Sequence, residues 1–319
     1  MHLWIGIDGG ATKTRVVAVG EDGVVIAEGL AGATNYQIVG VDAACLHLQQ
    51  AIQIALERIE ASLPVAAIVA GIAGLDGPDD VEPVRQIMQS AAAELNDPTW
   101  WAVNDTVAAW AGALAGEAGV IVISGSGAAA LAVGTDGNAV HADGWGHWLG
   151  DEGSGFDIGR RGLRAAVRYA DQRGPATQLL DRLIERFGAA WPSWVTSLNA
   201  MPGDAAHAQI ASFAPDVVEA ADVGDEVASS VLGHAAESLA QTAAGVIRRA
   251  QLSSPVRVAT VGSLFVHSRM LYAEFAKSLA QLVPGAVVNH PKRQPAEGAA
   301  LLAQRPALIP KDVIVVRGA

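Results

Sequence analysis

The chain repeats one pattern of three short strands, and this repeat limits the fold more than any other feature of the sequence. The first copy is "LWIGIDGG", "RVVAVG" and "GVVIAEG", and the second is "GVIVISGSG", "AAALAVG" and "NAVHADG", from Gly119 onward. In both copies the first turn is glycine-rich and the second contains Asp-Gly, a hairpin signal. The copies differ in most letters but share this pattern, which predicts an internal duplication and two domains.

The segments that follow each copy complete an α/β pattern. Helices are predicted over 42–62, 79–95, from 107, through most of 155–250, and over 268–282 and 296–303. Further strands are predicted in "VAAIVAGIAG", "TWWAVNDT", "VRVATVGSL" and "AVVNHP", and the final "IPKDVIVVRGA" is expected to be a loosely attached strand or tail. We therefore expect two α/β domains, residues 1–118 and 119–319, with mixed sheets flanked by helices and a helix near 296–305 packed back on the first domain.

Composition excludes several classes of protein. The chain has 319 residues, 51% hydrophobic and 17% charged, enough for two folded domains. Its apolar runs are too short to span a bilayer, and the N-terminus lacks the features of a signal peptide. The single cysteine, Cys45, excludes an internal disulfide and favours the cytoplasm. The net charge of −12 argues against nucleic-acid and membrane partners but is compatible with a phosphorylated ligand.

The motif "DGGATKT" lies at the first glycine-rich turn. Gly9 and Gly10 are expected to adopt positive φ and aim their N–H groups at an anion, with hydroxyl donors from Thr12 and Thr14. Asp8 is the candidate ligand for Mg²⁺, held directly or through water. A tight hairpin without a ligand is an equally good interpretation of this motif alone.

Two further glycine motifs occur in the second half of the chain. "SGSG" places Gly125, Ser126 and Gly127 at the equivalent turn of the second copy, so two such turns could hold one polyphosphate. "VGSLF" places Gly262 and Ser263 between a strand and a helix, where a nucleotide could bind. Many α/β loops have the latter pattern without binding anything.

Asp105, in "VNDTVAAW", lies where a strand ends and a helix begins. In isolation this position favours an N-cap, a role that Thr106 could also fill. The alternative is a general base at the strand ends. His141 and His147 have no third ligand at a familiar spacing, so no zinc site is expected there.

Together these segments resemble the sugar-kinase branch of the actin-like ATPase superfamily, in particular the N-acetylglucosamine kinases and the related BadF/BadG/BcrA/BcrD ATPases. The motifs that carry the resemblance are "DGGATKT", "NDT", "ISGSG" and "GWGHWLGDEGS", in this order. The resemblance implies two actin-like, ribonuclease H-like domains around a central cleft that closes on ATP and the substrate. It also implies a homodimer.

The resemblance assigns roles to the matching residues. It implies a first phosphate loop at Gly9, Gly10 and Thr12, and a second at Gly125, Ser126 and Gly127. It implies an adenosine motif at Gly262 and Ser263 and a general base at Asp105. The implied acceptor site consists of Asn35, Trp145, Gly146 and Asp151. The implied reaction is ATP-dependent phosphorylation of an amino sugar, with N-acetylglucosamine and its 6-phosphate as the first candidates. In "WGHWLGDEG" the tryptophan rings can cover the C–H face of a sugar, the carboxylates can accept hydrogen bonds from its hydroxyls, and the glycines let backbone groups approach it.

Structural roles remain open for several residues of this stretch. Asp151 could cap the helix that starts near Ser154, and Asn35 could be a turn residue. Trp148 and Leu149 are expected to turn into the core. Arg160 and Arg161 are expected on a solvated helix face.

Other functions also remain open. The acceptor could be glucosamine, N-acetylmannosamine or N-acetylmuramic acid, because "AGIAGLD" departs from the serine-rich version of the vertebrate enzymes. An ATPase that activates an iron–sulfur reductase would need more than the one cysteine, Cys45. A non-catalytic sugar sensor or repressor would carry an N-terminal helix-turn-helix, which we do not expect here, and the acidic balance disfavours DNA.

Overall fold

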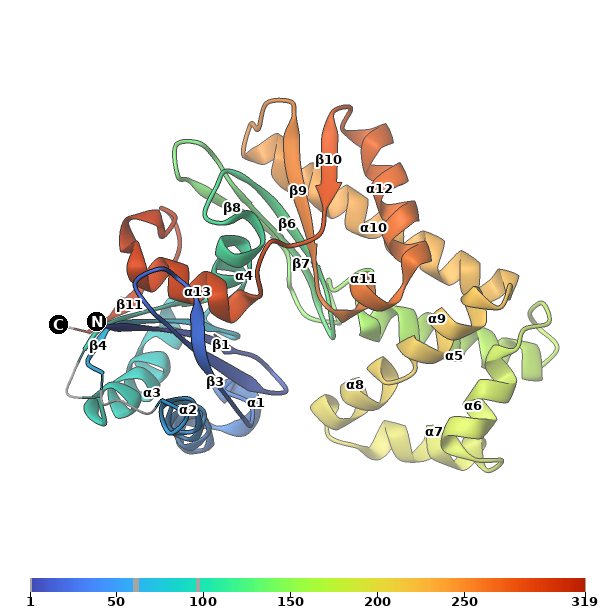
Figure 1. Ribbon diagram of the computed structural model, residues 1–319. Coiled ribbons are helices and arrows are strands. Elements are labelled where there is room, and N and C mark those ends of the chain that lie inside the picture. The colour runs from blue at the N-terminus through green and yellow to red at the C-terminus, as the bar shows by residue number, and fades with distance from the viewer. Residues whose placement is uncertain (1, 60–62, 96–97, 319) are drawn as a thin grey trace. The chain divides into compact units, whose positions relative to one another are not determined.

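The computed structural model describes residues 2–59, 63–95 and 98–318, which form two compact units (Figure 1). The first unit comprises the chain up to Ile121, residues 131–140 and the segment from His290 onward. The second unit comprises residues 122–130 and 141–289. None of the helices in the described part of the chain combines the length and apolar character that crossing a bilayer requires.

The first sheet has six strands in the order β11-β5-β4-β1-β2-β3. Their bounds are β1 Leu3–Gly9, β2 Thr14–Val19, β3 Val25–Ala31, β4 Val65–Ile72, β5 Thr99–Asn104 and β11 Val316–Arg317. Strand β1 is antiparallel to β2 and parallel to β4, which in turn is parallel to β5. The carboxyl ends of β1, β4 and β5 therefore meet at one edge of the sheet, where α/β proteins place ligands.

Helices cover both faces of this sheet. Their bounds are α1 Tyr36–Val39, α2 Val41–Leu56, α3 Val81–Ala93, α4 Asp105–Leu114 and α13 Pro295–Gln304, with short 3₁₀ turns at Pro78–Asp80 and Pro306–Leu308. On one face Ile5 and Ile7 of β1 join a buried cluster with α2 and α3. On the other face Gly6 packs directly on α13, because a Cβ there would overlap the Ala296 carbonyl. This alternation follows the two-residue period of a strand.

The second sheet has five strands in the order β10-β9-β6-β7-β8. Their bounds are β6 Gly119–Ser124, β7 Ala128–Val133, β8 Ala139–Asp143, β9 Val256–Val261 and β10 Ala286–Asn289. Strands β9 and β10 are parallel. The order repeats that of β5-β4-β1-β2-β3, so in both sheets a three-strand meander is extended by later strands on the side of its first strand, two in this sheet and three in the first, where β11 is added.

The second unit is otherwise helical. Its helices are α5 Gly155–Ala170, α6 Leu179–Phe187, α7 Trp191–Ala200, α8 Gly203–Ala211, α9 Ala214–Asp222, α10 Glu226–Arg249, α11 Ser263–His267 and α12 Arg269–Leu282. Helix α5 carries a glycine face at Gly155, Gly159 and Gly162. Side chains at Gly159 and Gly162 would overlap Ile210 and Val217, so the glycines let α8 and α9 approach closely.

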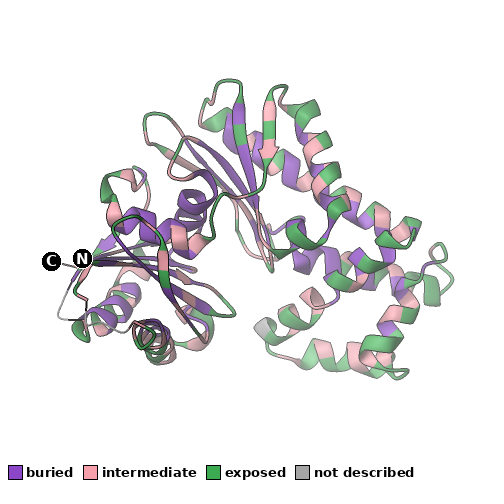
Figure 2. Cartoon of the chain, in the orientation of Figure 1, coloured by how far each residue is buried: buried purple, intermediate pink, exposed green. Residues whose placement is uncertain are grey.

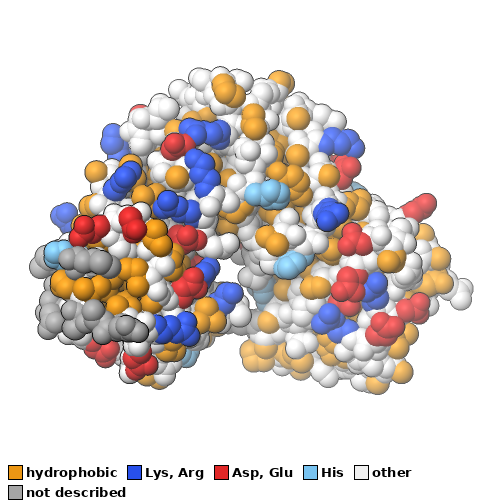
Figure 3. Space-filling model, viewed as in Figure 1, with side chains coloured by type: hydrophobic (Ala, Val, Ile, Leu, Met, Phe, Trp, Pro, Cys, Tyr) orange, Lys and Arg blue, Asp and Glu red, His pale blue; other side chains and the backbone are white. Residues whose placement is uncertain are grey.

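Burial and charge follow the expected division between interior and surface. The central strands of both sheets are buried, and exposed residues gather on the outer faces of the helices (Figure 2). On the face drawn in Figure 3, basic and acidic side chains are interspersed.

Two sequence predictions need correction. The helix predicted over 42–62 is α2, which ends at Leu56, and residues 60–62 lie outside the described residues. The C-terminal segment is not a loose tail over its described residues: β11 pairs antiparallel with β5, and Val316 is 1% exposed. Burial of this valine in the cluster beneath α3 explains why the segment is held.

Candidate functional site

Asp105 lies at the carboxyl edge of the first sheet, as the first residue of α4 directly after β5. The N-cap of α4 is Asn104, whose side-chain oxygen accepts a hydrogen bond of 2.9 Å from the Thr106 N–H. The suggestion that Asp105 or Thr106 caps the helix is therefore wrong. The preceding asparagine does so, which relieves Asp105 of that role.

The register of the sheet places Asp8 near Asp105. Asp8 is the partner of Gly71 in the parallel β1–β4 ladder, so both residues face the same side of the sheet. A Cβ on Gly71 would lie 2.5 Å from the Ala108 Cβ and 3.2 Å from the Asp105 Cα. Because glycine at position 71 has no side chain, the start of α4 can pack against the face of the sheet on which Asp8 and Gly71 lie.

The pKa of Asp105 is raised to about 7, chiefly by burial and then by the charges of Asp8 and Asp76. Burial also raises the pKa of Asp8, an effect that Lys13 and Arg15 partly offset. The pKa of Asp76 is raised by burial and by the Asp80 charge. A carboxyl group that titrates near neutral pH is suited to accept a proton from a substrate hydroxyl.

Sequence reasoning missed the part played by Asn104 and Asp76. The Asn104 amide donates to Asp76 at 2.8 Å while its oxygen caps α4, so one side chain joins the loop after β4 to the start of α4. The signal was present as the polar residue directly before Asp105 in "VNDT".

Asn35 lies beside the same loop. Its side chain caps α1 by accepting from the Gln37 N–H at 3.1 Å, and a Cβ on Gly74 would lie 3.1 Å from its oxygen. Gln37 donates to the Gly74 carbonyl at 3.1 Å. The acceptor-facing segment "AGIAGLD" is therefore held against the Asn35 turn, although Asn35 itself has a clear structural role.

The first glycine turn is a tight hairpin, closed by a 3.1 Å hydrogen bond from the Gly10 N–H to the Lys13 carbonyl. The prediction of positive φ at Gly9 and Gly10 is wrong, because neither residue is in the left-handed region. Glycine is needed at Gly9 for packing: a Cβ there would lie 2.9 Å from the Ile72 Cδ1. At Gly10 the nearest obstacle is the Lys13 carbonyl at 3.3 Å, so a bare backbone faces open space there.

Thr14 does not fit its predicted role as a phosphate donor. Its side chain is fully buried and its hydroxyl donates to the Gly32 carbonyl at 2.7 Å, with a further short contact to the Thr34 hydroxyl. Thr12 is exposed at the tip of the turn. We therefore keep Thr12 in the proposed phosphate loop and leave Thr14 out, because a committed, buried hydroxyl has no donor to offer.

The second glycine turn is built into the second unit by several contacts. The Gly125 N–H donates to the Gly127 carbonyl at 2.9 Å, and the Gly155 N–H at the start of α5 donates to the Gly125 carbonyl at 2.7 Å. The Ser124 hydroxyl donates to the Gly153 carbonyl at 2.7 Å. Here too neither Gly125 nor Gly127 has positive φ.

Gly262 brings the predicted adenosine motif to this turn. It precedes α11, has a φ of 105°, and packs so closely that a Cβ would overlap the Ser124 carbonyl. Ser263 is the first residue of α11. The backbones of "VGSL" and "SGSG", which are far apart in the sequence, therefore lie directly against each other.

The loop before α5 carries the predicted sugar residues. The Asp151 carboxylate is 8% exposed and accepts from the Ala128 N–H at 2.9 Å, and its pKa is raised chiefly by burial. It does not cap α5, because Ser154 is the N-cap. Trp145 is 76% exposed, and Gly146 has a φ of 75°. The indole of Trp145 is thus free of the core, as a face for a sugar would require.

One expectation for this loop is wrong. Trp148 and Leu149 do not enter the core but are 86% and 87% exposed. Arg160 and Arg161 are solvent-accessible as expected, with side chains 45% and 37% exposed, and both also pair with the buried carboxylate of Asp157. In this short, glycine-rich loop the backbone turns set the directions of the side chains, so the apolar character of Trp148 and Leu149 did not place them in the core.

The predicted residues fall into two groups, one in each unit. The first contains Asp8, Gly9, Gly10, Thr12, Asn35 and Asp105, and the second contains Gly125, Ser126, Gly127, Trp145, Gly146, Asp151, Gly262 and Ser263. Among the described residues, no group of three or more His, Cys, Asp or Glu side chains is arranged to hold a metal ion.

Comparisons with known proteins identify the family of this chain. The sequence model of the BadF/BadG/BcrA/BcrD ATPase family matches residues 5–303. The chain belongs to this family. The N-acetyl-D-glucosamine kinase of Dictyostelium discoideum is 29% identical, over 95% of this chain and 98% of that protein. The N-acetylmuramic acid/N-acetylglucosamine kinase of Clostridium acetobutylicum is 30% identical, over 95% of this chain and 99% of that protein.

The fold of this family member is also found in solved structures. A candidate N-acetylglucosamine kinase of Chromobacterium violaceum superposes with a TM-score of 0.75 at 25% identity, covering 96% of this chain and 99% of that chain. A ROK family glucokinase of Streptomyces griseus, with a TM-score of 0.58 at 18% identity over 94% and 98% of the chains, shares the fold. The predicted α/β fold of actin-like sugar kinases, with sheets flanked by helices, is confirmed.

Proposed function

We propose that this protein is an ATP-dependent kinase that phosphorylates a hydroxyl of an amino sugar. Membership of an ATPase family and the names of the relatives support a sugar kinase. A third relative, the glucosamine kinase GspK of Vibrio cholerae, is 29% identical over 75% of this chain and 78% of that protein. All three relatives act on amino sugars by name, which supports that substrate class.

The observation that carries the proposal is the Asp105 carboxyl group at the strand edge. Its pKa of about 7 means that a large fraction is ionised at neutral pH and still basic enough to accept a proton. In the proposed reaction Asp105 orients the acceptor hydroxyl and takes its proton as the oxygen attacks the γ-phosphoryl group. Phosphoryl transfer needs little more covalent help than this, since alignment and charge stabilisation dominate.

Magnesium fits this proposal through Asp8. Mg²⁺ in kinases is usually bound by one or two carboxylates together with water and substrate phosphates, so a single carboxylate at the end of β1 is a sufficient donor set. When bound, the ion would neutralise charge on the phosphates. The backbone of Gly9 and Gly10, and that of Gly125 to Gly127, would contact the phosphates in the same proposal, with Gly262 and Ser263 beside the adenosine.

The first candidate acceptor is N-acetylglucosamine, phosphorylated at its 6-hydroxyl. Asn35, Trp145, Gly146 and Asp151 would hold it, with the exposed Trp145 indole covering one face of the sugar. N-acetylmuramic acid is the second candidate, because the relative with 30% identity is named for both sugars. The cytoplasmic location, the homodimer and the lack of nucleic-acid partners stay predictions from the sequence.

The test is a coupled assay for ADP release by the purified protein with ATP, Mg²⁺ and a panel of sugars. The panel is N-acetylglucosamine, N-acetylmuramic acid, N-acetylmannosamine, glucosamine and glucose. We expect the highest kcat/KM with N-acetylglucosamine and a product that is a 6-phosphate by ³¹P NMR. ADP release that no sugar stimulates would contradict the proposal.

A further inference from the structure

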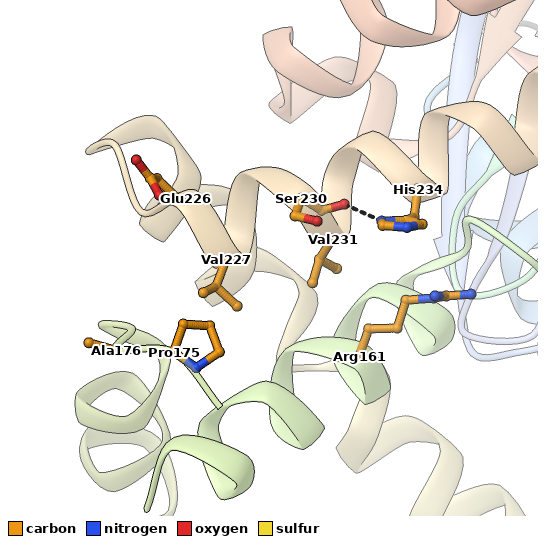
Figure 4. A pocket seen from close by; sticks show the side chains of 8 residues that line it. All are labelled: Arg161, Pro175, Ala176, Glu226, Val227, Ser230, Val231 and His234. Atoms are coloured by element: carbon orange, nitrogen blue, oxygen red, sulfur yellow. Dashed lines mark hydrogen bonds between the residues drawn. The ribbon is translucent and has the colours of Figure 1, made fainter. Parts of the chain in front are cut away.

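The second unit contains a cavity of about 450 Å³ between α5, the loop that follows it, and the first half of α10 (Figure 4). This volume lies within the range of small-molecule sites. Of the described residues that line it, none is among those assigned above to ATP or the sugar. The cavity therefore calls for its own explanation.

One end of the cavity carries excess positive charge. Arg161 lines it and pairs through its Nε with both oxygens of Asp157 at 2.9 Å, while Arg160 pairs with the same carboxylate at 3.0 Å. Asp157 is 3% exposed and also accepts from the Gly153 N–H at 3.2 Å. Two guanidinium groups thus share one fixed carboxylate, which leaves a net positive charge and a pre-oriented Arg161.

Two further donors stand on α10 toward the same end. The Nδ1–H of His234 donates to the Ser230 carbonyl at 2.7 Å, which fixes the ring, so Nε2 donates to an anion only when the ring is the doubly protonated imidazolium. Ser230 also lines the cavity with its hydroxyl. Figure 4 shows His234 and Arg161 toward one end and Glu226 toward the other, so an anion is favoured only at the arginine end.

The middle of the cavity is apolar. Val227 and Val231 project from α10, and Pro175 lies opposite them on the loop after α5 (Figure 4). An apolar group between these walls would be removed from water while the charged group stays at the arginine end. The lining therefore favours an amphipathic anion over a purely ionic one.

We propose that this cavity binds a phosphate monoester that carries an apolar group. The phosphate would lie at Arg161, Ser230 and His234, and the apolar group between Val227, Val231 and Pro175. The Arg161 guanidinium, the Ser230 hydroxyl and, in its imidazolium form, the His234 Nε2–H are three donors for the three terminal oxygens of a phosphate, whereas a carboxylate has only two oxygens. The dianionic charge of a phosphate near pH 7 also suits the net positive charge at this end.

Phenyl phosphate is the probe for this site, and its binding is measured by calorimetry. A saturating nonhydrolysable ATP analogue and Mg²⁺ are present throughout, so that the proposed nucleotide site is already filled. We expect the parent protein to bind phenyl phosphate. We expect His234→Ala and Ser230→Glu each to weaken that binding at least tenfold, by removing a donor or placing a like charge beside the phosphate.

A matched control is Gln241→Ala, an exposed position on the same helix outside the cavity, which should bind phenyl phosphate like the parent. Melting temperatures close to that of the parent establish that the variants are folded. Unchanged affinity in both cavity variants would overturn the proposal. So would a lack of binding by the parent, or binding of phenol as tight as that of phenyl phosphate.

Discussion

The carboxylate of Asp151 lies against Gly127: a Cβ on that glycine would be 2.9 Å from the Asp151 Oδ1, which accepts the adjacent Ala128 N–H at 2.9 Å. Asp151 was expected to serve the sugar, and Gly127 the nucleotide. Their contact joins the two predicted regions through one buried side chain. A change at Asp151 should therefore affect both ligands.

We predict that Asp151→Ala weakens binding of an ATP analogue as well as raising the KM for the sugar, and lowers the melting temperature. Loss of the carboxylate leaves the Ala128 N–H without its buried acceptor, which costs about 1–3 kcal/mol. Trp145→Ala is the contrasting variant. Its side chain is 76% exposed, so stability should hardly change, while the sugar KM rises roughly tenfold. Trp148→Ala, at a side chain that is 86% exposed, is the control for general effects on the loop.

Asp105→Asn should abolish most turnover without loss of ATP-analogue binding. Removal of a general base costs roughly two to four orders of magnitude in rate. Steady-state kinetics and calorimetry on the same preparation measure both quantities. Asp79→Asn, which changes an exposed carboxylate of the first unit, is the matched control and should keep normal rates. Normal turnover in Asp105→Asn would remove this residue from the mechanism.

The pH profile of the parent enzyme should report the same group. A base must be ionised to act, and the pKa of Asp105 is about 7, so kcat/KM should rise as the pH increases through 7. The Asp105→Asn variant should show no such rise in its residual activity. A profile of the parent that is flat between pH 5 and pH 8 would argue against Asp105 as the base.

Stability should follow the opposite trend. The pKa of Asp105 is raised in the folded state above the unfolded value near 3.9, so the folded state retains the proton at intermediate pH. Ionisation in the fold is therefore a cost that grows as the pH rises toward 7. Without ATP or Mg²⁺, Asp105→Asn should gain stability relative to the parent from pH 5 to pH 8, by on the order of a few kcal/mol at most. Calorimetric melting at both pH values measures this gain, which Asp79→Asn should not show.

Gly262→Ala and Gly125→Ala should separate packing from ligand contact at the second turn. A Cβ on Gly262 would overlap the Ser124 carbonyl in a left-handed conformation, so this variant should lose about 1–3 kcal/mol of stability together with ATP affinity. At Gly125 the nearest atom is the Gly127 carbonyl at 4.0 Å. Gly125→Ala should keep its melting temperature and lose ATP affinity alone. Full ATP affinity in that variant would exclude Gly125 from the phosphate site.

The same comparison applies to the first turn. Gly9→Ala should be destabilised, because its Cβ would lie 2.9 Å from the Ile72 Cδ1, whereas a Cβ at Gly10 would meet only the Lys13 carbonyl oxygen at 3.3 Å, which a small shift of the turn relieves. We expect Gly10→Val to fold normally and to weaken ATP-analogue binding by blocking the approach of phosphate. Normal nucleotide affinity in a well-folded Gly10→Val would mean that this turn is only a hairpin.

Much of the fold could be predicted from the chain alone, because strand and helix periods are local properties. Local sequence patterns are enough to predict the two three-strand copies and the α/β alternation. They also predict the positions of Gly10, Asp105 and Gly262 at strand ends. The role of Asn104 as the cap of α4, which was overlooked, is also a local property. The burial of Val316 was missed because it depends on β5 and α3, which are more than 200 residues earlier in the chain.

The sequence by itself determined the elements, their order and the residue types available at each strand end. Only the tertiary structure decided which side chains are free to act. The Thr14 hydroxyl is hydrogen-bonded to the Gly32 carbonyl and contacts the Thr34 hydroxyl. The Asp151 carboxylate accepts from the Ala128 N–H, and Trp148 is exposed to solvent. The same is true of the raised pKa of Asp105, which results chiefly from its burial and then from the charges of Asp8 and Asp76. The physical reason is that burial, hydrogen-bond partners and neighbouring charges are set by contacts between distant segments, which no local pattern contains.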